Sequence, residues 1–273
     1  FIMMHYFIPV FLLGLIFGSF FNVVIYRTPI FLDGKFKNKK QASLLNQLAW
    51  PASFCTSCKA KIEWFDNIPV LSWLNLKGRC RHCRQTIKIR YFIVELFTAF
   101  IFSYSFLKFG FSYTTIYWIA LFSILTILFF IDLETYYLPD LFTFTLILLA
   151  LVGSYLEITQ IAIADALVGA VIGFFVLYAV NFLYKLARKV DGFGGGDFKL
   201  LAGLGALFGW PSVLIIIGTS SILGLVCILL MTKLKQKKIQ LNSMLPFGPF
   251  LILAGLIMYA DTYLNFGLFK AYL

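Results

Sequence analysis

The chain has 273 residues, of which 61% are hydrophobic and only 13% are charged, and its formal net charge is +11. A typical soluble domain is about half apolar and about a quarter charged. The composition therefore excludes a soluble globular enzyme and a disordered protein. The 32 Phe and 14 Tyr residues are typical of a membrane-embedded bundle with aromatic side chains at its interfaces.

Long apolar runs recur along the chain, and a bilayer core about 30 Å thick needs about 20 apolar residues in one helix. The runs predict an all-α polytopic membrane protein with about eight transmembrane helices. The sixth run is short, so it is either tilted or continuous with the seventh. The predicted spans are residues 6–26, 91–108, 113–131, 139–157, 164–184, 200–211, 212–231 and 247–269.

Basic residues predict how these spans are oriented. The loops 185–199 and 232–246 carry four Lys or Arg residues each, and short loops rich in Lys and Arg stay in the cytoplasm. Two loops on the same side require two crossings between them, which favours eight spans. The first span has no Lys or Arg before it, whereas Arg27 follows it. We therefore expect the amino terminus outside the cytoplasm.

The segment that follows the first span holds 13 of the 23 basic residues. This distribution predicts three parts: a first transmembrane helix at 1–26, a cytoplasmic cysteine domain at 27–90, and a seven-helix membrane domain at 91–273. The positive charge of the segment has two interpretations, contact with anionic lipid head groups or binding of nucleic acid. Its position between two spans favours the lipid bilayer as partner and no nucleic acid.

Four of the five cysteines form two pairs, Cys55 with Cys58 and Cys80 with Cys83, and 21 residues separate the pairs. This spacing is typical of a four-thiolate zinc ribbon. A segment this small cannot bury enough apolar surface to fold alone, which favours a structural metal. Disulfides are disfavoured in the reducing cytosol, and a rubredoxin-like iron site that transfers electrons is an alternative.

Carboxylates close to membrane spans are candidates for function. Glu95 lies about one turn into the second span, where it can face the bundle. Asp132 ends the third span and Asp140 follows it, whereas Asp197 begins the sixth span directly after three glycines. The predicted topology places Asp132 and Asp197 at the same cytoplasmic edge. The glycines Gly194 to Gly196 permit close approach of a substrate strand and positive φ.

Two paired carboxylates can share a proton, one acting as base on a water and the other as acid on the scissile peptide. The same residues also fit other interpretations. Asp132 can simply end a helix, and the glycines can form a loop that leads into one. A proton-coupled membrane transporter with a structural zinc domain is the alternative function, because such transporters also carry carboxylates within spans.

Distinctive motifs follow one another over nearly the whole chain. They are 18–27 (GSFFNVVIYR), the two cysteine pairs, 66–73 (DNIPVLSW), 90–96 (RYFIVEL), 131–132 with 138–140, 194–201 (GGGDFKLL) and 246–249 (PFGP). Together they resemble the bacterial type IV prepilin leader peptidases that are also N-methyltransferases. These enzymes are inner-membrane aspartic proteases of the Gly-x-Gly-Asp type.

The resemblance implies that Asp132 and Asp197 are the catalytic pair and that Asp140, Gly194, Gly196 and Lys199 support the site. It implies cleavage of type IV prepilins and type II secretion pseudopilins after a glycine, followed by methylation of the new amino terminus with S-adenosylmethionine. A peptidase that has lost methylation remains an alternative. The chain has no glycine-rich nucleotide-binding motif after a strand. The cysteine domain and residues 18–27 are where we expect the methyl-transfer site, and Asn22 is expected to be a polar partner inside the bundle.

Overall fold

A computed structural model describes residues 2–32, 44, 48, 52–235, 245–264, 266–267 and 269. The described parts are helical, and apart from two isolated β-bridges they contain no extended pairing. The elements are α1 (Ile2–Leu32), η1 (Trp64–Asn67), α3 (Leu71–Asn75), α4 (Arg90–Phe109), α5 (Tyr113–Thr135), α6 (Asp140–Tyr155), α7 (Ile163–Arg188), α8 (Gly195–Phe208), α9 (Trp210–Lys235) and α10 (Gly248–Leu264).

The prediction of an all-helical membrane protein is confirmed. Within the described residues, five helices are long and apolar enough to cross a membrane, namely α1, α4, α5, α7 and α9. Each of the other three predicted spans also coincides with a helix, but α6 and α10 are shorter and α8 has only 14 residues. α1 continues to Leu32, beyond the predicted end of the span at residue 26, and Arg27 and Thr28 are buried within it.

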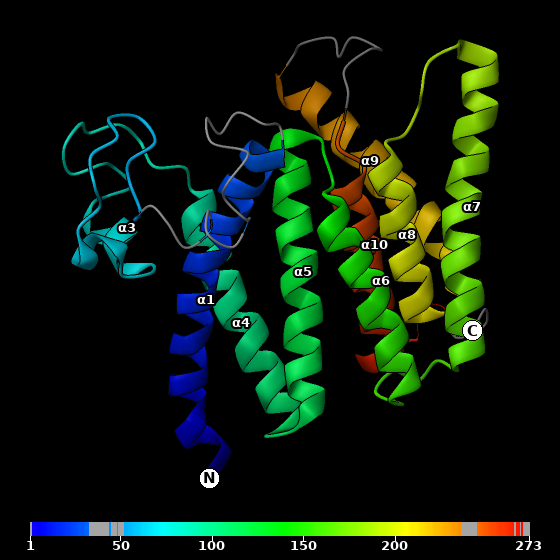
Figure 1. Cartoon of the computed structure of the whole chain (residues 1–273), viewed down its shortest axis with the longest axis horizontal. Helices are drawn as coiled ribbons and strands as arrows, with labels where there is room; N and C mark the ends of the chain where they lie inside the picture. Colours follow the sequence, from blue (N-terminus) through cyan, green and yellow to red (C-terminus); the bar gives the residue numbers. More distant parts are fainter. Residues whose placement is uncertain are drawn as a thin grey trace. The chain divides into compact units, whose positions relative to one another are not determined.

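The chain divides into two compact units, Phe1–Ile127 and Leu128–Leu273. In the first unit α1 packs along α4, as Figure 1 shows. Two glycines of α1 bring the backbones together. A Cβ atom at Gly14 would lie 2.6 Å from the Cα of Ala99, and one at Gly18 would lie 2.6 Å from the Cα of Glu95. Small residues at such contacts are typical of helix packing in membranes.

The second unit is built around α8, which packs against α6, α7, α9 and α10 (Figure 1). Every residue of α8 from Leu200 to Phe208 is buried. Glycines permit this packing, because a Cβ atom at Gly173 would lie 2.6 Å from the carbonyl oxygen of Leu201. Gly209, with φ of 82°, separates α8 from α9. The sixth and seventh predicted runs are therefore two helices and not one continuous stretch.

Candidate active site

Asp132 lies in the last turn of α5, and its side chain is buried, with 4% of the residue exposed. The helix ends soon afterwards at Tyr136, whose backbone has a positive φ of 56° and whose N–H donates to the carbonyl of Asp132 at 2.9 Å. Oδ2 of Asp132 is buried and has no hydrogen-bond partner among the described residues. This carboxylate therefore retains a free acceptor inside the protein.

Asp197 lies in the first turn of α8 and is also buried, with 8% exposed. Its carboxylate accepts a hydrogen bond from the N–H of Gly194 at 3.2 Å, and its own N–H donates to the Gly194 carbonyl at 3.1 Å. The helix N-terminus favours a carboxylate at this position. The glycines therefore form the N-cap and first turn of α8 and not a loop before it, and the hydrogen bond from Gly194 orients the Asp197 carboxylate.

Contacts around Leu138 place the two aspartates in one site. A Cβ atom at Gly196, the residue before Asp197, would lie 2.6 Å from the Cβ of Leu138. A Cβ atom at Gly248 would lie 3.2 Å from the Cδ1 of Leu138 and 2.7 Å from Oδ2 of Asp132. Leu138 thus contacts both Gly196, the residue before Asp197, and Gly248, which packs against Asp132. Two carboxylates at this proximity can divide the roles of acid and base.

The three glycines before Asp197 have different surroundings. Gly194 has φ of −74°, and none of the three has positive φ, so the expectation of positive φ was wrong. The reason is that Gly194 lies at the helix N-cap while Gly195 and Gly196 are already helical. The expectation of close approach holds at Gly196 against Leu138, whereas a Cβ atom at Gly195 would meet nothing within 4 Å.

Asp140 and Lys199 form an ion pair that joins the start of α6 to α8. Nζ of Lys199 donates to Oδ1 of Asp140 at 2.6 Å and lies 5.0 Å from the ring centre of Phe144. The Asp140 side chain is 59% exposed, in contrast to the buried pair. The Asp140 carboxylate is engaged by Lys199 and therefore links α6 to α8, the helix that carries Asp197.

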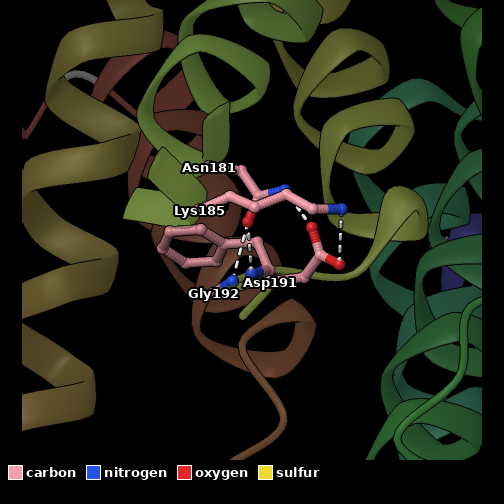
Figure 2. Close-up of polar contacts among 5 residues, drawn as sticks. Asn181, Lys185, Asp191 and Gly192 are labelled. Carbon is pink, nitrogen blue, oxygen red and sulfur yellow. Dashed lines mark hydrogen bonds and ion pairs between the residues drawn. The ribbon is translucent and has the colours of Figure 1, made fainter. Parts of the chain in front are cut away.

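A buried asparagine of α7, which the sequence analysis did not single out, fixes the loop that leads to Asp197. Figure 2 shows Asn181 and Lys185 reaching from α7 to Asp191 and Gly192. Oδ1 of Asn181 accepts the N–H groups of Gly192 at 2.7 Å and of Phe193 at 3.0 Å. Its amide also donates to Asp191 at 3.2 Å. A polar residue within an apolar run is the signal that could have indicated this role.

The same loop also contacts the segment beside Asp132. Hydrogen bonds from Lys185 and then Asn181 lower the pKa of Asp191, so this exposed carboxylate is ionised at neutral pH. The ring of Phe193 lies 5.1 Å from that of Phe247, which precedes Gly248. Gly248 in turn packs against Asp132. The loop before Asp197 therefore directly contacts the segment that packs against Asp132.

The four paired cysteines come together as predicted, in two loops with matching backbone bonds. In the first, the N–H of Cys55 donates to the carbonyl of Ala60 and the N–H of Lys59 donates to that of Cys55, both at 2.9 Å. In the second, the N–H of Cys80 donates to Gln85 at 2.9 Å and that of Arg84 donates to Cys80 at 3.0 Å. Lys59 and Arg84 both have positive φ.

The geometry of this cysteine cluster fits a tetrahedral zinc. The four sulfur atoms lie within 4.8 Å of one another, and those of Cys55 and Cys83 are 3.9 Å apart. Zinc bonded to sulfur at about 2.3 Å would place two ligands about 3.8 Å apart. Burial raises the pKa of Cys55, but hydrogen bonds led by the backbone of Cys58 and Ser57 hold it at about 6. Backbone donors of Cys83 and His82 likewise lower the pKa of Cys80. The backbone of Gln85 lowers the pKa of Cys83, but burial and the neighbouring thiols together raise it to about 11. Thiolates are the form that binds metal.

Comparisons with known proteins cover most of the chain. Residues 12–109 match the Bacterial Peptidase A24 N-terminal domain, and residues 119–229 match the Type IV leader peptidase family. The chain is 38% identical over 271 residues to a prepilin leader peptidase/N-methyltransferase of Aeromonas salmonicida, which covers 92% of this chain and 89% of that protein. It is 36% identical over 274 residues to the protein of the same name from Pseudomonas aeruginosa, covering 95% and 93%. No solved structure matches the chain.

These matches, together with the helical bundle, define an enzyme of the membrane. The chain belongs to the type IV leader peptidase family. The resemblance inferred from the sequence motifs is confirmed, and the alternative of a proton-coupled transporter has no support among these relatives.

Proposed function

We propose that this enzyme cleaves the basic leader of type IV prepilins and type II secretion pseudopilins after a glycine, and then methylates the new amino terminus. The names of the matched relatives support both activities. The observation that carries the peptidase assignment is the buried pair, Asp132 and Asp197, assembled around Leu138 with one carboxylate oxygen unpartnered. Peptide hydrolysis by two carboxylates needs no metal.

In the proposed mechanism one aspartate is ionised and the other protonated. The ionised carboxylate takes a proton from water as the water oxygen attacks the carbonyl carbon of the leader glycine. The protonated carboxylate polarises that carbonyl and then gives a proton to the leaving nitrogen, so that the peptide bond breaks and a free amine remains. Gly194 orients Asp197 and Gly196 lets it approach Leu138. The pair Asp140 with Lys199 holds α6 and α8 together.

The proposed topology has eight membrane-spanning helices, with the amino terminus in the periplasm and the cysteine domain and active site at the cytoplasmic face of the inner membrane. Support comes from helices at all eight predicted positions, five of which are long and apolar enough to cross a membrane within the described residues, and from the basic loops around 185–199 and 232–246. Lys237 and Lys238 of the second loop lie outside the described residues, as does much of the predicted domain 27–90 between 33 and 51. The division into 1–26, 27–90 and 91–273 stays part of the proposal.

Zinc is the proposed resident metal, held by Cys55, Cys58, Cys80 and Cys83 to fold the cysteine domain. All four ligand positions are filled by protein, which is typical of a structural site. S-adenosylmethionine is the proposed methyl donor, and the described residues include no nucleotide-binding turn between a strand and a helix. The expected partners are prepilin and pseudopilin substrates and the lipid bilayer.

The test is to incubate the purified full chain in liposomes with a prepilin and to measure the product by mass spectrometry. We expect loss of the leader after its last glycine, and an added methyl mass only when S-adenosylmethionine is present. A prepilin that stays intact under all conditions would contradict the peptidase assignment, and cleavage without a methyl gain would contradict the second activity alone.

A further inference from the structure

A group of buried polar atoms lies between α1 and α4 in the first unit, and the peptidase mechanism does not use it. Asn22 from α1 is 2% exposed and Glu95 from α4 is 8% exposed. The amide nitrogen of Asn22 donates to the carbonyl of Tyr91 at 3.0 Å, one turn before Glu95. The close contact of Gly18 with the Glu95 backbone brings the two helices together at this level.

The carboxylate of Glu95 is held by neutral donors. Its Oε2 accepts the N–H of Val70 at 2.7 Å, and the hydroxyl of Ser19 also bonds to the carboxylate. Within the described part of the chain no Lys, Arg or His forms an ion pair with Glu95. Burying a carboxylate without a cation is unfavourable, and buried charges in proteins are normally paired. A positively charged ligand would therefore supply the cation that the buried Glu95 carboxylate lacks.

Asn22 adds a second acceptor to this group. Its Oδ1 is buried and has no hydrogen-bond partner among the described residues, while its nitrogen is fixed on Tyr91. A buried acceptor without a partner is destabilising and is uncommon in native structures. Asn22 thus presents an oxygen acceptor that lacks a donor, and Glu95 presents a carboxylate that has neutral donors but no cation. A group with several N–H donors and a positive charge, such as a primary amine in its ammonium form, is the complementary ligand.

The backbone above Glu95 is strained. Val70 has φ of 63° and ψ of −52°, and the N–H of Leu71 donates to the carbonyl of Pro69 at 2.6 Å. These values describe a γ-turn with positive φ at its centre, which is rare, and a β-branched residue there is an outlier. Such strain is typical of functional sites, where the surrounding structure maintains it. The turn directs its N–H at Glu95, so opening it would expose the carboxylate and relieve strain at the same time.

We propose that Glu95 and Asn22 bind the free α-amino group that leader cleavage produces and present it for methyl transfer. This inference rests on the proposed function, since it names the amine-binding residues of its second step. The bound ammonium first gives one proton to the Glu95 carboxylate, which frees the lone pair of its nitrogen. The nitrogen then bonds to the methyl carbon of the sulfonium donor as the carbon–sulfur bond breaks and its electron pair stays on sulfur. Glu95 and Asn22 are thus assigned to methylation, apart from the aspartate pair.

The test compares binding of two synthetic peptides by the full chain in detergent, without any methyl donor. Both begin with Phe and continue as an apolar segment, but one has a free amino terminus and the other is N-acetylated. We expect wild type to bind the free amine at least about 10-fold more tightly, a difference of about 1.4 kcal/mol. Glu95→Gln, which keeps an acceptor for Val70, should remove that preference, and Asn22→Leu should reduce it.

Thr98→Val is the matched control. Thr98 is buried on α4 three residues beyond Glu95, and its hydroxyl only donates to the carbonyl of Val94 at 2.7 Å. This variant should keep the preference for the free amine, and zinc content and thermal unfolding should report that all variants are folded. Equal binding of the two peptides by wild type, or an undiminished preference in Glu95→Gln, would overturn the inference. If wild type discriminates through Glu95 but never methylates a cleaved prepilin, the amine site stands and the proposed methylation fails.

Discussion

Replacing Gly196 with alanine tests the packing that brings the two aspartates together. The new Cβ atom would lie 2.6 Å from the Cβ of Leu138, whereas carbon atoms in contact are about 3.5–4.0 Å apart. One of the two segments must therefore move by about 1 Å, and Leu138 is buried and cannot swing away. Overpacking of this kind costs about 1–3 kcal/mol, and the better helix propensity of alanine offsets about 1 kcal/mol of it.

The expected stability loss is thus small, about 0–2 kcal/mol, but the effect on activity is large. A displacement of about 1 Å at reacting groups can lower the rate about 100-fold. Cleavage of a prepilin should therefore fall about 100-fold in Gly196→Ala, with KM changed less than kcat. The assay is quantitative mass spectrometry of the released product, with thermal unfolding measured in the same detergent.

Gly195→Ala is the matched control, because its Cβ atom would meet nothing within 4 Å and it lies in the same turn of α8. It should remain folded with a melting temperature equal to or above that of wild type, and it should lose much less activity. A double-mutant cycle of Gly196→Ala with Leu138→Gly, which removes the Cβ atom that the new methyl group meets, should show a coupling of about 0.5–3 kcal/mol. Equal losses in the two glycine variants, or additive effects in the cycle, would refute the reasoning.

Three further predictions follow from the site and the cysteine domain. Asn181→Ala removes the acceptor for the N–H groups of Gly192 and Phe193. The loop before Asp197 should then be less well fixed, and kcat should fall about 10-fold or more. Asp191→Asn keeps the contact with Asn181, and its kcat should stay near that of wild type. Elemental analysis should find one zinc for each colourless chain, and Cys55→Ser should lose the metal and unfold the cysteine domain; a coloured iron-containing protein would contradict this. The hydrogen bond from Arg81 lowers the pKa of Asp66 in the folded domain. The pair therefore stabilises the domain fully at pH values above the ordinary carboxyl pKa of about 4. This contribution is lost as the pH falls through the lowered pKa of the folded state. The measurement is the melting temperature of the domain as a function of pH. Asp66→Asn should make the fall in melting temperature at acidic pH less steep, and an unchanged fall would contradict the assignment.

Apolar run lengths predicted the positions of the long helices because each run must satisfy its backbone hydrogen bonds within itself. α8 shows where this signal weakens. The helices α6, α7, α9 and α10 bury α8. The length of α8 therefore depends on close packing at glycines more than on the thickness of the bilayer. The basic loops 185–199 and 232–246 favoured two crossings between them, and the positive φ of Gly209 shows where α8 and α9 separate.

The cysteine spacing predicted the cluster, since two residues between ligands close a loop around one metal. The expectation of positive φ at the glycines before Asp197 was wrong. An acidic residue three positions after the N-cap commonly accepts a hydrogen bond from the N-cap N–H. This pattern could have indicated that Gly194 is the N-cap of α8. The roles of Asn181 and Val70 depend on segments distant in the chain, and sequence alone does not reveal them.

The most direct test of the central claim is the cleavage rate of Asp132→Asn and Asp197→Asn, compared with wild type in liposomes. Asparagine keeps the size of each side chain and removes its ability to exchange a proton, so a general acid or base should lose at least about 100-fold in rate. Both variants should fold, retain zinc and fail to release the leader. If either folded variant cleaves a prepilin at close to the wild-type rate, the assignment of the catalytic pair is contradicted.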